Sequence, residues 1–120
     1  MSETLLIIED NEQSAYLMRF LLEKKGYNVI SARNGREGTH MALIHRPKAI
    51  LLDIQLPEMD GYAVASELRT SSETKDIPII AVTSYAMVGD REKILSSGAT
   101  GYIEKPIDPE TFIEEIQRYF

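Results

Sequence analysis

The sequence contains no cysteine, which excludes a disulfide framework and a metal site built from thiolates. It also lacks any apolar stretch near ~18 residues, and residues 1–4 carry no signal-peptide core, so neither a membrane span nor a secretory leader is expected. Basic residues number 13 against 19 acidic ones, and the net charge of −6 argues against direct nucleic-acid binding. We therefore expect a soluble, cytoplasmic protein that contacts neither nucleic acid nor membrane.

The chain has the length and composition of one folded unit. Its 120 residues match one ordinary domain, and 43% of them are hydrophobic, which is enough for a real core. No repeat, low-complexity tract or linker interrupts the sequence. Residues 1–120 are therefore interpreted as a single domain, which is either a stand-alone protein or one domain of a longer chain.

Short apolar runs alternate with helical patterns five times. The predicted strands cover residues 5–8, 27–32, 49–53, 77–82 and 101–103, and the predicted helices cover residues 11–25, 35–45, 61–69, 88–97 and the end of the chain. Asn34 is expected to cap the second helix, and Asp108 to cap the last, with Pro109 at its first position. The run at 27–32 is less apolar than the others, as an edge strand would be.

This alternation is typical of an α/β fold, in which a parallel sheet carries helices on both faces. Crossovers between parallel strands are right-handed, so few topologies remain. The commonest one for this length is a doubly wound, flavodoxin-like five-stranded sheet in strand order 2-1-3-4-5. Its ligand crevice lies at the carboxyl ends of the strands, between strands one and three.

Polar side chains follow the apolar runs at the carboxyl ends of four strands. Glu9 and Asp10 follow the first, Asp53 ends the third, Thr83 follows the fourth, and Lys105 follows the fifth. In a parallel sheet these ends share one edge, so the side chains should converge. Two unit charges ~4 Å apart repel by about 4 kcal/mol at an effective dielectric of ~20, so crowded carboxylates need a cation. Oxygen ligands alone favour a hard cation, and Mg²⁺ is the expected cofactor.

The same cluster suits phosphoryl transfer. The carboxylate of Asp53 could attack phosphorus and form an aspartyl phosphate, and it needs no general base because it is ionised at neutral pH. Lys105 and Mg²⁺ would stabilise the charge on the phosphoryl oxygens, and the Thr83 hydroxyl could donate a hydrogen bond to one of them. Taken singly, each residue also suits a turn or a strand end, so the hypothesis depends on the set.

Four segments carry a family resemblance along essentially the whole chain, at residues 7–11, 53–61, 81–84 and 105–106. They resemble the receiver domain of bacterial two-component response regulators, of which chemotaxis-type receivers are examples. The resemblance implies that Asp53 accepts the phosphoryl group, that Asp10 and Asp53 bind Mg²⁺ directly, and that the carbonyl of Gln55 completes the protein ligands. Glu9 stands where many relatives have Asp, and its longer side chain would still reach the metal through water.

The resemblance also implies a switch and its partners. Thr83 and Tyr102 look like the family's switch pair, Lys105 looks like its phosphate-contacting lysine, and the Lys105–Pro106 bond is expected to be cis. The phosphoryl donor would be a sensor histidine kinase or a histidine phosphotransfer protein. The phosphorylated form would engage a downstream protein through the fourth helix, fifth strand and fifth helix. More narrowly, the chain is similar to stand-alone receivers of the cell-division-control type.

Two other functions compete with this hypothesis. A haloacid-dehalogenase-like phosphatase also uses an Asp nucleophile with Thr, Lys and Mg²⁺, but it needs an acidic proton donor two residues later, where this chain has Gln55. A receiver-like module that is never phosphorylated would not need all the site residues. A flavin or dinucleotide role lacks a glycine-rich loop after the first strand. We expect a phospho-acceptor with Mg²⁺-dependent self-phosphorylation and self-dephosphorylation, and no other enzyme activity.

Overall fold

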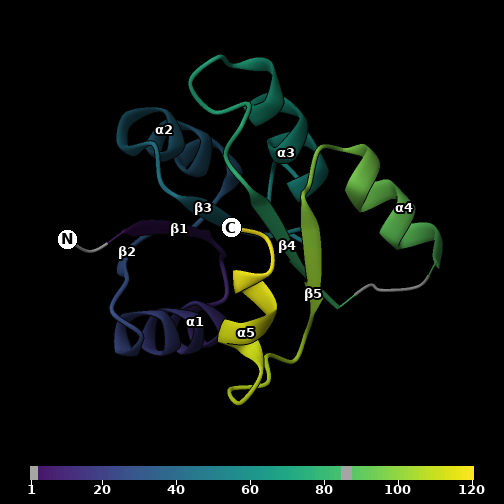
Figure 1. Ribbon diagram of the computed structural model, residues 1–120. Helices are drawn as coiled ribbons and strands as arrows, with labels where there is room; N and C mark the ends of the chain where they lie inside the picture. The colour runs from purple at the N-terminus through teal and green to yellow at the C-terminus, as the bar shows by residue number, and fades with distance from the viewer. Residues whose placement is uncertain (1–2, 85–87) are drawn as a thin grey trace.

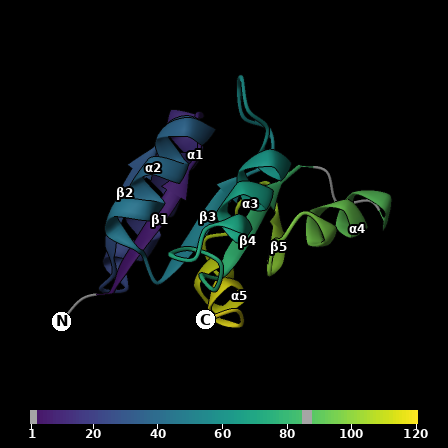
Figure 2. The ribbon, with the colours of Figure 1, turned by 90° about the horizontal axis from the view of Figure 1, so that it is seen from above.

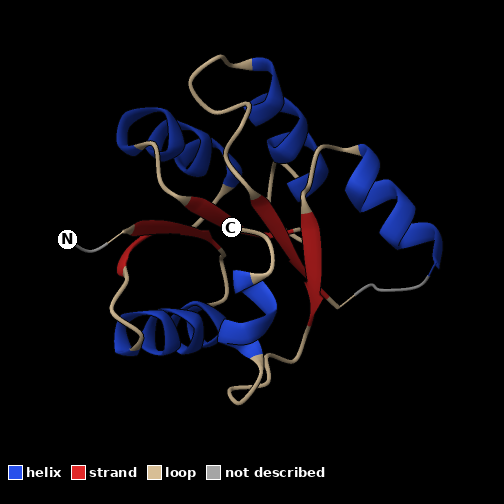
Figure 3. Ribbon diagram, in the orientation of Figure 1, coloured by secondary structure: helices blue, strands red, loops and turns tan. Residues whose placement is uncertain are grey.

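The computed structural model describes residues 3–84 and 88–120. The strands are β1 (Thr4–Ile8), β2 (Asn28–Ala32), β3 (Ala49–Asp53), β4 (Ile79–Thr83) and β5 (Gly101–Glu104). The helices are α1 (Glu12–Lys24), α2 (Gly35–His45), α3 (Gly61–Thr70), α4 (Val88–Ser96) and α5 (Phe112–Gln117). They alternate as the sequence predicts (Figure 1, Figure 3). No helix within the described residues has the length and apolar character needed to cross a bilayer.

All five strands run parallel in one sheet, in the order β2-β1-β3-β4-β5. This confirms the predicted order and places β2 at an edge. Leu5 of β1 pairs with Val29 of β2 on one side and with Ala49 of β3 on the other. Because the strands are parallel, their carboxyl ends lie at one edge of the sheet, where ligands bind in open α/β folds.

The sheet separates two hydrophobic cores, because successive residues of a strand face opposite sides. Leu6 and Ile8 of β1 face a core that α2, α3 and α4 cover, whereas Leu5 and Ile7 face a core that α1 and α5 cover. Figures 1 and 2 show the two groups of helices on opposite faces of the sheet. The central strands are thus buried on both faces, which explains their unbroken apolar sequences.

Most helix ends follow from local sequence. Asn11, Asn34 and Asp60 cap α1, α2 and α3, and each side-chain oxygen accepts the backbone N–H of the residue three positions later. Asn34 was the predicted cap of its helix. Gly26 and Gly98 follow α1 and α4 with φ of 102° and 118°, a conformation that glycine adopts without steric cost.

The predicted start of the last helix is wrong. α5 begins at Phe112 with Thr111 as its N-cap, and Asp108 and Pro109 lie before it. The Asp108 carboxylate accepts the N–H of Glu110, and its carbonyl accepts the N–H groups of Thr111 and Phe112. Asp108 therefore closes a turn onto its own backbone, which is the local alternative that Asp offers to capping a helix.

A tyrosine lies at each face of β5: Tyr102 belongs to the strand itself, and Tyr119 follows α5. Tyr102 packs against the core that α2, α3 and α4 cover, and Tyr119 packs against the opposite core. Gly101 makes room for the second contact, because a Cβ there would overlap the ring of Tyr119. A side chain at position 101 would therefore force the Tyr119 ring to move away from β5.

Candidate functional site

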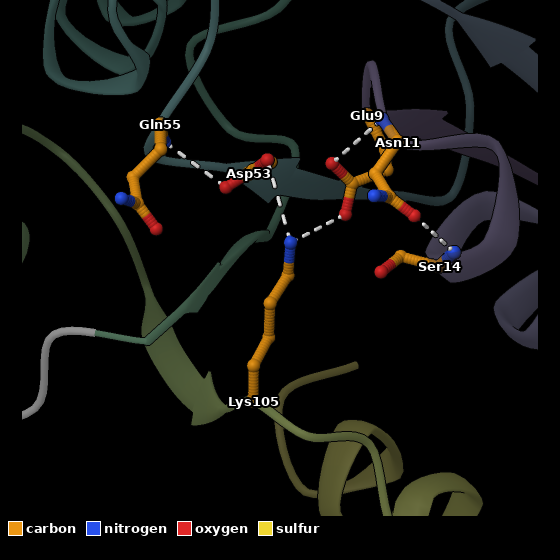
Figure 4. Close-up of polar contacts among 6 residues, drawn as sticks. All are labelled: Glu9, Asn11, Ser14, Asp53, Gln55 and Lys105. Atoms are coloured by element: carbon orange, nitrogen blue, oxygen red, sulfur yellow. Dashed lines mark hydrogen bonds and ion pairs between the residues drawn. The ribbon is translucent and has the colours of Figure 1, made fainter.

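Three ionisable side chains from three strands meet at the carboxyl edge of the sheet (Figure 4). Glu9 follows β1, Asp53 is the last residue of β3, and Lys105 follows β5. The Lys105 Nζ lies 2.7 Å from Glu9 Oε1 and 3.4 Å from Asp53 Oδ2, so one ammonium forms ion pairs with two carboxylates. The side chains of Glu9 and Asp53 are 0% and 3% exposed. The convergence predicted from the sequence is therefore present for these three residues.

Burial and mutual contact change the acid–base properties of this cluster. The pKa of Glu9 is raised from 4.5 to about 7, chiefly by burial and next by a hydrogen bond with Asp53, while Lys105 acts in the opposite direction. Burial alone would lower the pKa of Lys105, but the hydrogen bond to Glu9 and the charge of Asp53 outweigh it, so the pKa of the ammonium is raised. Lys105 thus stays protonated while the two carboxylates compete for it.

Asp10 adds a third carboxylate at the solvent side of the same edge. Its side chain is exposed, and carboxylate oxygens of Glu9, Asp10 and Asp53 lie within 4.8 Å of one another. A single lysine does not neutralise three such groups. A set made only of oxygen donors, open to water on one side, fits a small hard divalent cation. The structure thus supports a metal-binding site at this cluster.

The backbone after β3 fixes the orientation of Asp53. The Gln55 N–H donates to Asp53 Oδ1 at 3.0 Å (Figure 4). The Gly61 N–H donates to the Ile54 carbonyl at 2.9 Å. A Cβ on Gly61 would lie 2.5 Å from Ile54 Cα, so α3 can begin this close to β3 only with glycine there. Glu58 in the intervening loop has φ of 65°, a conformation that costs energy for any residue but glycine.

Asn11 is a site residue whose role the sequence analysis did not identify. Its side chain caps α1, and its backbone N–H donates to Glu9 Oε2 at 3.4 Å. Asn11 therefore links the buried carboxylate to the start of the helix. The signal was present in the sequence, because Asn directly before a helical pattern is a common N-cap.

Thr83 and Tyr102 lie on the same face of neighbouring strands. Thr83 ends β4, is fully buried, and its carbonyl accepts the N–H of Lys105 at 2.8 Å. Tyr102 is half-buried on β5, where it pairs with Ala81 of β4. The structure therefore places Thr83 beside the cluster and Tyr102 farther back along the next strand. The peptide bond between Lys105 and Pro106 is cis, as the resemblance implies.

Comparison with known sequences identifies relatives along nearly the whole chain. Residues 5–117 match the family model of the response regulator receiver domain. The polar-differentiation response regulator DivK of Brucella anthropi is 47% identical over 119 residues, which cover 99% of this chain and 97% of that protein. DivK of Brucella ovis is 45% identical over the same length, with the same coverage.

Solved structures agree with the sequence relatives. Chemotaxis protein CheY4 of Vibrio cholerae has a TM-score of 0.95 at 28% identity, and the match covers 100% of both chains. The receiver domain of a sensor histidine kinase from Pseudomonas aeruginosa was solved with magnesium in its active site cleft. It has a TM-score of 0.91 at 33% identity, covering 99% of this chain and 98% of that one. Together with the fold and the acidic cluster, these matches show that the chain belongs to the response regulator receiver domains, which act in two-component signalling.

Proposed function

We propose that Asp53 accepts a phosphoryl group from a phosphohistidine of a sensor histidine kinase or a histidine phosphotransfer protein. The observation that carries this proposal is the position of Lys105, whose ammonium lies between the carboxylates of Glu9 and Asp53. Asp53 is the carboxylate that ends a central strand, and a backbone N–H orients it. Donors of this kind act in the cytoplasm, and residues 1–120 act there as a single receiver domain.

The chemistry needs few protein groups. A carboxylate oxygen of Asp53 forms a bond to phosphorus while the bond from phosphorus to the imidazole nitrogen of the donor breaks, and that nitrogen retains the electron pair. Lys105 offsets the charge of the phosphoryl oxygens, and the Thr83 hydroxyl donates to one of them. Glu9, Asp10, Asp53 and the carbonyl of Gln55 would hold Mg²⁺, which supplies further positive charge at these oxygens.

The product acts as a signal through a change of surface. The phosphoryl group draws Thr83 toward the site, and the ring of Tyr102 turns into the space that this movement opens. α4, β5 and α5 then form a different surface for a downstream protein. Attack of water on phosphorus, with Asp53 as the leaving group, returns the resting state, and the domain would promote this hydrolysis itself with Mg²⁺ held by the acidic cluster.

The test is chemical labelling of the purified protein. Incubation with Mg²⁺ and acetyl phosphate should add one phosphoryl group by intact mass, and Asp53→Asn should abolish the gain. Asp76→Asn is a matched control, because Asp76 is exposed in the loop before β4. Equal labelling of the wild type and Asp53→Asn would refute the proposal, as would labelling that does not require Mg²⁺.

A further inference from the structure

α4 is attached to the domain by few apolar contacts. Among its described side chains only Ile94 is buried, and Leu95 is 48% exposed. The helix packs mainly against β5 and lies at the outer end of the sheet in Figures 1 and 2. Two cationic residues, Arg91 and Lys93, extend from α4 to aromatic rings on other elements. Ile94 anchors α4 in the core, and these two contacts add to its attachment.

Arg91 contacts two residues of β5 at once. Its guanidinium carbon lies 5.5 Å from the centre of the Tyr102 ring, and its Nη2 lies 3.4 Å from Glu104 Oε1. Tyr102 and Glu104 are two positions apart on one strand, so both side chains point to the face of the sheet that α4 covers. One guanidinium thus holds the ring from the solvent side and is itself held by a carboxylate.

This contact opposes the movement that the switch requires. Thr83 pairs with Glu104, and Ala81 pairs with Tyr102, so Thr83 lies on the same face as Tyr102 and closer to the acidic cluster. A ring that turns inward toward Thr83 leaves the guanidinium above it. If the ring turned inward in this way, the contact with Arg91 would be lost.

We propose that Arg91 is a positioning residue that holds Tyr102 in its half-exposed orientation and so sets the resting balance of the switch. The proposal rests on the function proposed above for Thr83 and Tyr102. A cation–aromatic contact at a partly exposed site changes a two-state ratio by about two- to fivefold, and the exposed ion pair to Glu104 adds little. A contact of this size biases the two-state ratio without fixing it, so a ligand with differential affinity can still shift it.

Lys93 provides a matched control on the same helix. Its Nζ lies 4.4 Å from the centre of the Tyr62 ring, and Tyr62 belongs to α3 rather than to β5. Removing the charge of Lys93 changes the net charge as much as removing that of Arg91, and it also deletes one cation–aromatic contact of α4. It leaves the contact with Tyr102 intact, so the two variants separate a specific effect on the switch from a general loosening of the helix.

The experiment follows Tyr102 directly by ¹⁹F NMR of protein labelled with 3-fluorotyrosine, its resonance assigned with Tyr102→Phe. The end points are the metal-free wild type and the wild type saturated with Mg²⁺ and beryllofluoride. In metal-free Arg91→Gln the resonance should move toward the saturated position, with the inward fraction raised about two- to fivefold. Lys93→Gln should leave the resonance at the wild-type position. Arg91→Lys should shift it less than Arg91→Gln does, because lysine keeps the charge. Beryllofluoride should bind Arg91→Gln more tightly by the same factor.

The outcomes separate this proposal from the one on which it rests. If the resonance moves with beryllofluoride but Arg91→Gln leaves it at the wild-type position, the role of Arg91 is refuted and the switch stands. Equal shifts in Arg91→Gln and Lys93→Gln also refute it, because they show loosening of α4. If the wild-type resonance does not move when beryllofluoride binds, the switch itself is refuted.

Discussion

Replacing Glu9 with glutamine should make the stability of the metal-free protein less dependent on pH. The pKa of Glu9 is about 7 in the folded protein against 4.5 for the free side chain, because the carboxylate is buried and contacts Asp53. The native state thus holds this proton more tightly than the unfolded state does. The stability contributed by protonated Glu9 is fully present below about pH 4.5 and is lost as the pH rises through about 7.

The size of the effect follows from the shift. Each pKa unit corresponds to about 1.4 kcal/mol, so the shift of Glu9 removes up to about 3 kcal/mol of unfolding free energy above pH 7. Urea unfolding followed by circular dichroism, with EDTA present, measures this at pH 4.5 and at pH 8. As the pH rises, the wild type should lose stability that Glu9→Gln retains. The unfolding free energy of Glu9→Gln minus that of the wild type should therefore become more positive.

Two controls test whether the pH dependence comes from Glu9. Glu114→Gln, an exposed position on α5, should give the same pH profile as the wild type. Saturating Mg²⁺ should reduce the loss of wild-type unfolding free energy at pH 8, because a cation stabilises the ionised form of Glu9. If the profiles of Glu9→Gln and the wild type run parallel between pH 4.5 and 8, the buried carboxylate does not titrate as the structure indicates.

Three further predictions concern the metal, the loop after β3 and the start of α3. Millimolar Mg²⁺ should raise the melting temperature by mass action, and Asp10→Asn should weaken this rise; an unchanged melting curve would contradict the metal site. Glu58→Gly should raise the urea midpoint by the equivalent of about 0.5–1 kcal/mol, since φ of 65° suits glycine, and a lower midpoint would argue against strain there. Gly61→Ala should lower the unfolding free energy by about 1–3 kcal/mol, because its Cβ meets Ile54 Cα at 2.5 Å, and a neutral result would mean that the backbone shifts freely.

The site could be predicted largely because parallel strands end at a common edge. Glu9, Asp53 and Lys105 stand directly after strong apolar runs, so their convergence follows from topology without knowledge of side-chain packing. That Lys105 lies between both carboxylates could not be predicted. It depends on how deeply Glu9 is buried and on the path of the chain after β5, which are properties of the packed molecule.

Other features failed prediction for local reasons. Asp108 has the sequence context of a helix cap, but its carboxylate binds a nearby backbone N–H, and such local hydrogen bonds compete closely with capping. Glu58 gives no sign of its left-handed backbone, because glycine or asparagine would be the expected residue there. In the sequence, Arg91 looks like any surface arginine of a polar helix. Its contact with the Tyr102 ring depends on how α4 packs against β5.

The glycine at position 101 has a practical consequence for reporter design. Because it lets Tyr119 lie against β5 on the face opposite Tyr102, the end of the α5 segment lies against the same strand that carries Tyr102. A fluorophore attached after Phe120 would therefore report displacement of β5 from the face opposite Tyr102. Replacing Gly101 with alanine would displace the Tyr119 ring and so weaken the contact between that reporter and the strand.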